Sequence, residues 1–400
     1  MRIGLVTSEA LGNGLGTSTT VLGLANSLSS LGHDVHILAP GEQTKKTQRS
    51  LTIHGYGGHL TEYTRWLMGK AYESRRLARK TVLRPRILRF VIRSLENHVV
   101  KWADRLTLDI IEGHQELASS ACISAGSKLR TKIVSRFHNV WFEECLELGL
   151  VSERDDEFQF LKELTASIID ESDVVITPTP YMKRYFQTRL YPSDHSSIVS
   201  VWPGAVPQIL SINDDHILKR IVYSGSLNRL EGLPLYIQAA SLVPKLDISI
   251  CGKGNGGAVA KLAESLSRDV QFCWFENRQD YLDYLSKCLA GVVPWGRSQS
   301  RLLGFPMKLL DYISVGLPVI ASKIGSWSDC VEELGFGIVS EPNCTDWAKA
   351  LRAIVEDKDS HRSMRMKAWE ASKTVFSWNN SISKILEEYK GLLDPSIGAR

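Results

Sequence analysis

The stretch from Gly304 to Ser322 (GFPMKLLDYISVGLPVIAS) constrains the fold more than any other part of the chain. Pro306 suits the first turn of a helix, where no backbone N–H is lost. The spacing predicts a helix over 308–315, which the residues from Gly316 to Pro318 end. The apolar run 319–321 is typical of a central strand in a parallel sheet. A turn, a short helix and a buried strand therefore follow one another here.

Two charged residues lie in the first turn of this predicted helix. Lys308 and Asp311 are three positions apart, so they lie on neighbouring faces. A helix start with free N–H groups, a cation and a carboxylate suits a phosphate together with a ribose diol. An ordinary capped surface helix is the alternative that this segment leaves open.

The same stretch resembles the nucleotide-sugar site of retaining glycosyltransferases of the GT4 family, which have the GT-B fold. In that family two carboxylates eight positions apart bind the donor, and a Gly-x-Pro-Val-Ile-Ala turn and strand follows. Asp311 falls on the second carboxylate, which holds the ribose in the family, and Leu309 lies in the same donor-binding segment. The first carboxylate falls on Leu303, which departs from the family pattern.

The length of 400 residues predicts two domains, because single cores stop growing near about 250–300 residues. The resemblance implies an α/β chain with the GT-B fold, in which two Rossmann-like, doubly wound parallel-sheet domains face a central cleft. Pro203 to Val206 resembles the family's crossing between domains. We therefore expect an N-terminal domain over 1–203, a donor-binding domain over 204–375, and a final segment over 376–400 that packs back on the first domain.

The start of the chain predicts a strand–turn–helix unit. The expected strand Arg2–Thr7 leads into a glycine-rich turn, in which Gly14 and Gly16 let backbone N–H groups approach a ligand, and a helix over 19–31 follows. A dinucleotide-binding domain is the rival interpretation, and it requires an acid at the end of the second strand. That strand ends Leu-Ala-Pro-Gly41, without an acid, so we favour a phosphate-binding turn of the GT4 type.

Two later strands, predicted over 110–113 and 132–136, each lead to a histidine. Ligands of open parallel sheets sit beyond the carboxyl ends of the strands, where His138 is expected. In GT4 members the histidine that ends this strand reaches the donor sugar, and His138 followed by Asn139 matches it. We interpret His114 as a structural residue.

The expected donor domain departs from its family at the phosphate-binding loop. GT4 enzymes place an arginine after the first strand of this domain and a lysine five residues on, and the matching residues are Ser226 and Glu231. A charge-assisted hydrogen bond to phosphate contributes about 1.5–3 kcal/mol, so the loss of two would weaken donor binding. We expect Arg229 and Lys308 to restore this charge, and Ser226 to remain among the residues that bind the donor phosphates.

The remaining site predictions come from the resemblance. A strand and turn end at Phe275 and Glu276, where the family's backbone meets the base. His138 and Asp311 are the expected catalytic residues, and neither a covalent nucleophile nor a bound metal or other cofactor is expected. Asp357-Lys-Asp359 matches the Asp-x-Asp motif of metal-dependent GT-A transferases, but it lies in a polar helix-end segment and we interpret it as coincidence.

The segment 65–105 concentrates positive charge, with twelve Lys and Arg against three acids, for a net +9 in a chain of net +4. Apolar residues are interleaved with the cations, which predicts basic amphipathic helices broken at Pro85. Such helices can lie on an anionic membrane surface, where each cation contributes about 1 kcal/mol. A solvated helical hairpin is an equal alternative, and nucleic acid is not an expected partner.

The cysteines and the hydropathy of the sequence indicate in which cellular compartment the protein is expected. Seven cysteines without a Cys-x-x-Cys pair argue against disulfides and a zinc site, and for a reducing compartment. No secretory signal and no apolar run of about 18–20 residues is visible. We expect a cytoplasmic protein, or one peripheral on the inner face of the membrane.

These features predict a metal-independent retaining glycosyltransferase. It would move a sugar from a UDP- or GDP-sugar to a glycan or lipid-linked acceptor, in polysaccharide or glycolipid biosynthesis. Two alternatives stay open. One is a catalytically degenerate GT-B subunit that binds glycan or a partner transferase, and the other is a GT-B epimerase that acts on the nucleotide sugar itself.

Overall fold

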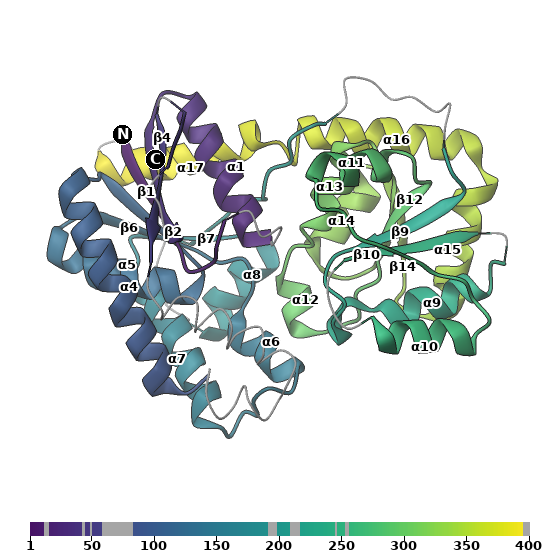
Figure 1. Cartoon of the computed structure of the whole chain (residues 1–400), viewed down its shortest axis with the longest axis horizontal. Coiled ribbons are helices and arrows are strands. Elements are labelled where there is room, and N and C mark those ends of the chain that lie inside the picture. The colour runs from purple at the N-terminus through teal and green to yellow at the C-terminus, as the bar shows by residue number, and fades with distance from the viewer. Residues whose placement is uncertain are drawn as a thin grey trace. The chain divides into compact units, whose positions relative to one another are not determined.

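A computed structural model describes residues 1–11, 16–41, 45–48, 50–57, 83–190, 198–208, 217–244, 246–252 and 256–394. Gly14 and residues 65–82 of the basic segment lie outside the described part. The chain divides into two compact units (Figure 1). The first comprises Met1–Trp202 with Ser381–Arg400, and the second comprises Pro203–Asn380.

The first unit is built on an eight-stranded sheet in the order β3-β4-β2-β1-β5-β6-β7-β8. All neighbouring strands are parallel except the antiparallel pair β3 and β4. The strands are β1 (Arg2–Thr7), β2 (Asp34–Pro40), β3 (Lys45–Gln48), β4 (Leu51–Tyr56), β5 (Ile110–His114), β6 (Lys132–Arg136), β7 (Val174–Thr177) and β8 (Ile198–Ser200).

Helices cover both faces of this sheet. From β1 the chain moves outward to β2, whereas from β5 it moves to β6 in the opposite direction. Right-handed crossovers therefore place α1 and α5 on opposite faces. The helical elements are α1 (Gly16–Ser30), α4 (Pro85–Leu106), α5 (Gln115–Leu129), α6 (Trp141–Glu147), α7 (Asp156–Glu171), α8 (Pro180–Tyr185), η2 (Phe186–Leu190) and α17 (Trp378–Leu393).

The second unit is a six-stranded, fully parallel sheet in the order β11-β10-β9-β12-β13-β14. Its strands are β9 (Arg220–Ser224), β10 (Asp247–Cys251), β11 (Gln271–Cys273), β12 (Ala290–Val293), β13 (Val319–Ser322) and β14 (Gly337–Ser340). Its helical elements are η3 (Arg229–Glu231), α9 (Leu233–Ser241), α10 (Gly257–Ser265), α11 (Arg278–Ser286), α12 (Gln299–Leu303), α13 (Lys308–Ser314), α14 (Gly325–Glu333), α15 (Cys344–Glu356) and α16 (Lys358–Lys373).

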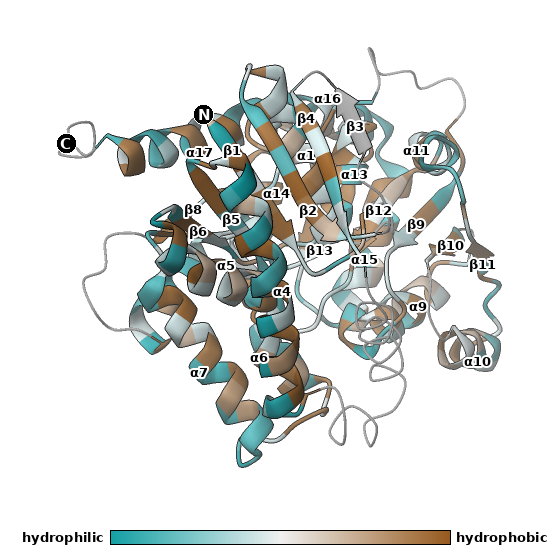
Figure 2. Ribbon diagram, turned by 60° about the vertical axis from the view of Figure 1, so that its left-hand side comes forward, coloured by the Kyte–Doolittle hydropathy of each residue, from teal (hydrophilic) through white to brown (hydrophobic). Residues whose placement is uncertain are grey.

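The apolar runs of the sequence form the cores of these sheets. Strand β13 is completely buried, as are Leu309 and Ile313 of α13, so the predicted helix and strand after Gly304 are confirmed. In the first unit, the apolar residues of β2 are brown in Figure 2, and all but the two end residues of this strand are buried. The short helix α12, which precedes Gly304, was not predicted.

The last helix returns to the first unit, as predicted. It begins at Trp378, whose ring lies against Gly204: a Cβ on that glycine would come within 2.5 Å of Trp378 Cδ2. Farther along α17, the buried Tyr389 donates a hydrogen bond from its hydroxyl to the carboxylate of Glu112 on β5. A side chain near the end of the sequence thus satisfies a charge in the N-terminal sheet.

The described half of the basic segment forms the amphipathic helix α4, which begins at Pro85. Helix α4 buries six residues against the protein, Leu88, Leu95 and Trp102 among them, and packs along α5. Its outward residues are mostly hydrophilic (Figure 2). Within the described residues, no helix has the length and apolar composition that a membrane span requires.

We predict that Tyr389→Phe destabilises the first unit. The change removes one donor from the fully buried Glu112 carboxylate, and an unsatisfied buried group costs about 1–3 kcal/mol. Urea denaturation would measure the loss. Tyr181→Phe, at a residue that is 42% exposed, is the matched control, and equal effects of both changes would contradict the prediction.

Candidate functional site

The second unit has its topological switch point between β9 and β12. The chain leaves β9 toward β10 and leaves β12 toward β13, so the two connections diverge at the carboxyl ends of these strands. Gly225 follows β9 with a φ of +137°, a conformation that favours glycine. Gly232 approaches the other connection so closely that a Cβ would lie 1.6 Å from the carbonyl oxygen of Pro294. The two loops therefore pack directly on each other.

A buried carboxylate, that of Glu231, lies at this switch point. Its Oε2 is 2.5 Å from Lys308 Nζ, 2.9 Å from the Tyr223 hydroxyl and 3.0 Å from Trp295 Nε1. Its Oε1 is 3.3 Å from the Ser226 hydroxyl and 3.4 Å from Arg301 Nη2. Burial alone raises the pKa of Glu231, but Lys308 and Arg301 outweigh it and lower the pKa to about 2. Glu231 is therefore an anion.

Lys308 is held at the same point from α13. Its side chain is 9% exposed, and its ammonium lies 4.2 Å from the centroid of the Tyr223 ring. A Cβ on Gly225 would come within 2.9 Å of Lys308 Cε, so a side chain at position 225 would displace the end of the lysine. Arg301 stacks over Trp295, 4.8 Å from its ring centroid. Two cations and two aromatic rings thus enclose one carboxylate.

The structure brings together some of the predicted phosphate-binding residues. Ser226 and Lys308 both contact Glu231, whereas Arg229 is exposed at the start of η3. Sequence reasoning missed Arg301, two positions before Leu303. The available signal was Glu231 itself, because a buried anion needs counter-charges. Leu303 is 2% exposed, so the position of the family's first carboxylate belongs to the core.

Asp311 lies one turn along α13 from Lys308 and has other partners. Its Oδ1 is 2.6 Å from Nη2 of Arg278, and its Oδ2 accepts from the Tyr281 hydroxyl at 3.3 Å. The Tyr281 hydroxyl also lies 2.8 Å from Ser224 Oγ at the end of β9. The carboxylate is 21% exposed, so it is fixed in place while still open to a ligand. Arg278 was not predicted.

Leu309, Phe275 and Glu276 differ in what they can offer a ligand. Leu309 is completely buried, and its N–H donates to the Pro306 carbonyl at 2.8 Å, so this N–H is not free for a ligand. Phe275 is half-buried beside the ring of Tyr284, with centroids 5.1 Å apart. Glu276 is exposed.

The first unit carries a second buried carboxylate near its strand ends. Glu112 Oε1 accepts from Arg136 Nε at 2.5 Å and lies 3.2 Å from His114 Nε2. His114 Nδ1 is 3.1 Å from His138 Nε2, and the two rings stack. His138 therefore contacts His114, and His114 lies beside the ion pair of Glu112 and Arg136. His114 is completely buried, and its interpretation as a structural residue stays a prediction.

Two further sequence features have structural roles in the described residues. Gly16 is the first residue of α1, and its carbonyl accepts from the Thr20 hydroxyl at 3.0 Å. Asp357 caps α16 by accepting from Ser360 N–H at 2.9 Å, which accounts for the Asp-x-Asp match.

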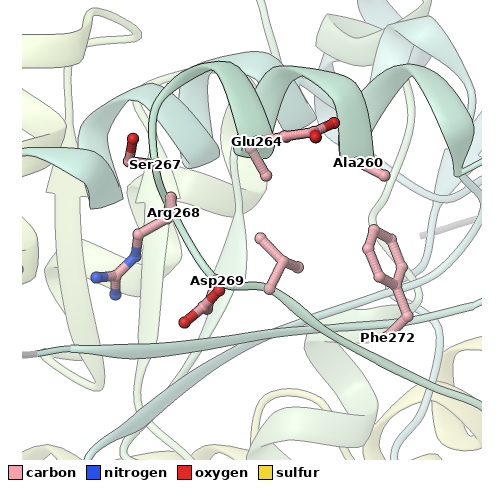
Figure 3. Close-up of a pocket in the computed structure, with 8 residues that line it drawn as sticks. Ala260, Glu264, Ser267, Arg268, Asp269 and Phe272 are labelled. Carbon is pink, nitrogen blue, oxygen red and sulfur yellow. The ribbon is translucent and has the colours of Figure 1, made fainter.

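A separate hollow lies between α10 and β11 (Figure 3). Its lining residues, which include Glu264, Arg268 and Phe272, contain none of the predicted donor-site residues. The close-up shows Phe272 at one end and Arg268 with Asp269 at the other.

Comparison with known proteins identifies the class of enzyme to which this chain belongs. The family model described as Glycosyltransferase Family 4 matches residues 15–207, and the one described as Glycosyl transferases group 1 matches residues 210–371. A D-inositol 3-phosphate glycosyltransferase from Nocardia farcinica (strain IFM 10152) is 33% identical over 319 residues, which cover 73% of this chain and 68% of that protein. For another curated relative, the aligned region spans 45% of the relative's length.

Solved structures share the fold. Sucrose-phosphate synthase from Thermosynechococcus elongatus superimposes with a TM-score of 0.75 at 15% identity, covering 98% of this chain and 99% of that one. Anabaena Alr3699/HepE, solved with UDP, gives a TM-score of 0.68 at 14% identity, covering 98% and 100%. The fold is GT-B, and the chain is a glycosyltransferase by its family models. It belongs to the GT4 family, in agreement with the resemblance seen in the sequence.

We predict a smaller pH dependence of stability in His138→Gln. Burial, then His114 and Arg136, hold the pKa of His138 well below its usual range, whereas an unfolded histidine titrates near about 6.5. The folded state therefore binds fewer protons than the unfolded state below that pH, and stability is lost as pH falls. Removing one such group should reduce the slope of the unfolding free energy against pH, between about pH 6.5 and 5, by about 1.4 kcal/mol per pH unit.

Urea denaturation of wild type and His138→Gln at several pH values would measure this difference. Parallel pH dependences for the two proteins would show that His138 titrates normally in the folded state.

Proposed function

We propose that this chain moves a sugar, with retention, from a UDP- or GDP-sugar to a glycan or lipid-linked acceptor, in polysaccharide or glycolipid biosynthesis. Family membership supports sugar transfer from a nucleotide sugar. The observation that carries the proposal is the placement of Lys308 and Asp311. Both side chains sit at the carboxyl ends of the second sheet, where nucleotides bind in such folds.

In this proposal Asp311 accepts hydrogen bonds from the ribose diol. Arg278 and Tyr281 fix the carboxylate in advance, which lowers the entropy that binding must remove. The side chain of Phe275 and the backbone at Glu276 meet the base. Leu309 supports this site from the core, since its side chain is buried.

Lys308 contacts the diphosphate from the start of α13, and Arg229, exposed in the loop after β9, approaches it from solvent. Charge develops on the departing diphosphate in the transition state, and a cation held in a nearly dry site stabilises it more than water would. In the first unit His138 contacts the sugar, and the glycine-rich turn that contains Gly14 and Gly16 binds phosphate. The resemblance to GT-B enzymes supports transfer without a bound metal or other cofactor.

A catalytically degenerate subunit is the strongest alternative. Glu231 and Leu303 favour it, because an anion and an apolar side chain occupy positions where the family has a cation and a carboxylate. A nucleotide-sugar epimerase is the second alternative. Purified protein incubated with UDP- and GDP-sugars separates the three: hydrolysis or transfer supports the proposal, absence of nucleotide binding supports the first alternative, and an altered sugar without transfer supports the second.

We predict that Lys308→Met weakens UDP or GDP binding at least tenfold, because one charge-assisted contact to phosphate contributes about 1.5–3 kcal/mol. Isothermal titration calorimetry would measure the affinity. Lys349→Met removes a lysine whose side chain is 68% exposed and serves as the matched control. Equal affinities in wild type and Lys308→Met would remove Lys308 from the donor site.

We also propose that the first unit associates with anionic membrane as a peripheral protein on the cytoplasmic side. The outward face of α4 supports this, because it carries an excess of positive charge. It has five exposed cations and one exposed carboxylate: Arg86, Arg89, Arg93, Lys101 and Arg105, and Asp104. Six residues of α4 are buried in the protein, so the attraction to the membrane is mainly electrostatic. Phe90, which is 59% exposed, adds an aromatic side chain to this face.

We predict that the combined change Arg86→Gln, Arg89→Gln and Arg93→Gln reduces binding to phosphatidylglycerol vesicles by at least tenfold, at about 1 kcal/mol per cation near the surface. Vesicle sedimentation at low and at physiological salt would measure it. The matched control is the triple variant Lys349→Gln, Lys358→Gln and Lys373→Gln, which removes the same amount of positive charge from the second unit. An equal loss in both triple variants would show that net charge, and not this face, determines binding.

A further inference from the structure

The anion at position 231 is an unusual feature of a site that should bind a diphosphate. An isolated carboxylate there would repel phosphate, and the buried state of Glu231 would be strongly unfavourable without counter-charges. The structure supplies two. Lys308 from α13 and Arg301 from α12 both reach Glu231, so the described cluster has two cations and one anion and a net charge of +1.

The cluster also fixes where the charge lies. Lys308 is held by the Glu231 carboxylate, by the Tyr223 hydroxyl at 3.1 Å and by the face of the Tyr223 ring. Tyr223 and Trp295 come from the ends of β9 and β12, the two strands that flank the switch point. The lysine ammonium is therefore placed at the point of the sheet where a bound phosphate is expected.

We propose that Glu231 is a positioning residue for donor binding: it keeps the Lys308 ammonium charged and in place, and Lys308 with Arg301 supplies the positive charge that binds a nucleoside diphosphate. The charges that the family carries on the loop after β9 have thus moved to α12 and α13, and the loop carries their counter-ion. This inference rests on the proposed function for the identity of the ligand.

The groups that face Lys308 show why its charge depends on Glu231. Burial lowers the pKa of Lys308, Glu231 raises it and Arg301 lowers it further. Tyr223 also contacts Lys308, and burial and Glu231 hold the pKa of its hydroxyl well above the usual value, so this hydroxyl stays neutral. Asp311, on the same helix, pairs instead with Arg278. With Glu231 neutralised, a desolvated lysine would be left beside an arginine and would lose its proton more readily.

The first test measures Lys308 itself and needs no ligand. Protein labelled with ¹³C-lysine reports the protonation of each lysine through its Cε shift, and Lys308→Arg assigns the resonance. We expect the midpoint for Lys308 to fall by at least one pH unit in Glu231→Gln, which keeps the shape and one acceptor but removes the charge. An unchanged midpoint would overturn the proposal.

The second test measures binding of UDP and of GDP by calorimetry between pH 7.0 and 8.5. We expect an affinity that varies little in wild type and falls at least tenfold toward pH 8.5 in Glu231→Gln. The double variant Glu231→Gln with Lys308→Arg should lose this fall, because arginine stays charged at every pH used. A residue that only stabilises the fold would weaken binding equally at all pH values, without rescue.

The two tests separate the inference from the proposed function. Failure of wild type to bind either nucleotide would contradict the nucleotide-sugar function, and with it the ligand assigned to Lys308 and Arg301, while the lysine titration would still decide whether Glu231 maintains the charge. Binding by wild type with the same pH profile in Glu231→Gln would contradict the inference alone.

Discussion

The ion pair between Glu231 and Lys308 is the interaction on which the geometry of the second unit's strand ends depends. It joins the loop after β9 to the start of α13, two segments far apart in the sequence. A buried pair of this kind adds little net stability compared with an apolar replacement, but breaking it leaves one charge unpaired at high cost. It fixes position, which is what a binding site needs.

The first unit repeats this principle with a different carboxylate. Glu112 on β5 accepts from Arg136 on β6 and from Tyr389 on α17, and it lies beside His114. Strands that are neighbours in the sheet and a helix from the end of the chain therefore meet at one buried anion. In each unit a charge that would be unfavourable alone is surrounded by donors from several elements. In the second unit the carboxylate holds Lys308 directly, whereas in the first unit His138 contacts His114, which lies beside the carboxylate.

Helix α4 shows why an amphipathic sequence pattern does not determine whether the apolar face of a helix covers lipid or a protein core. Its apolar and basic residues are consistent both with a helix lying on lipid and with a helix packed on a protein core. In the structure Leu88, Leu95 and Trp102 are buried within the unit, and the cations remain outside. Periodicity identifies which residues share a face, whereas only the surrounding sheet and α5 decide what that face covers.

The sequence alone determined the alternation of strands and helices, the parallel sheets and the family, because these depend on local periodicity, helix stops and the motif around Asp311. It also identified Glu231 and Leu303 as departures. Only the tertiary structure decided that Glu231 pairs with Lys308, that Arg301 joins them, and that Arg278 holds Asp311. Such partners are brought together by the order of strands in the sheet, and that order places residues far apart in the sequence within hydrogen-bonding distance.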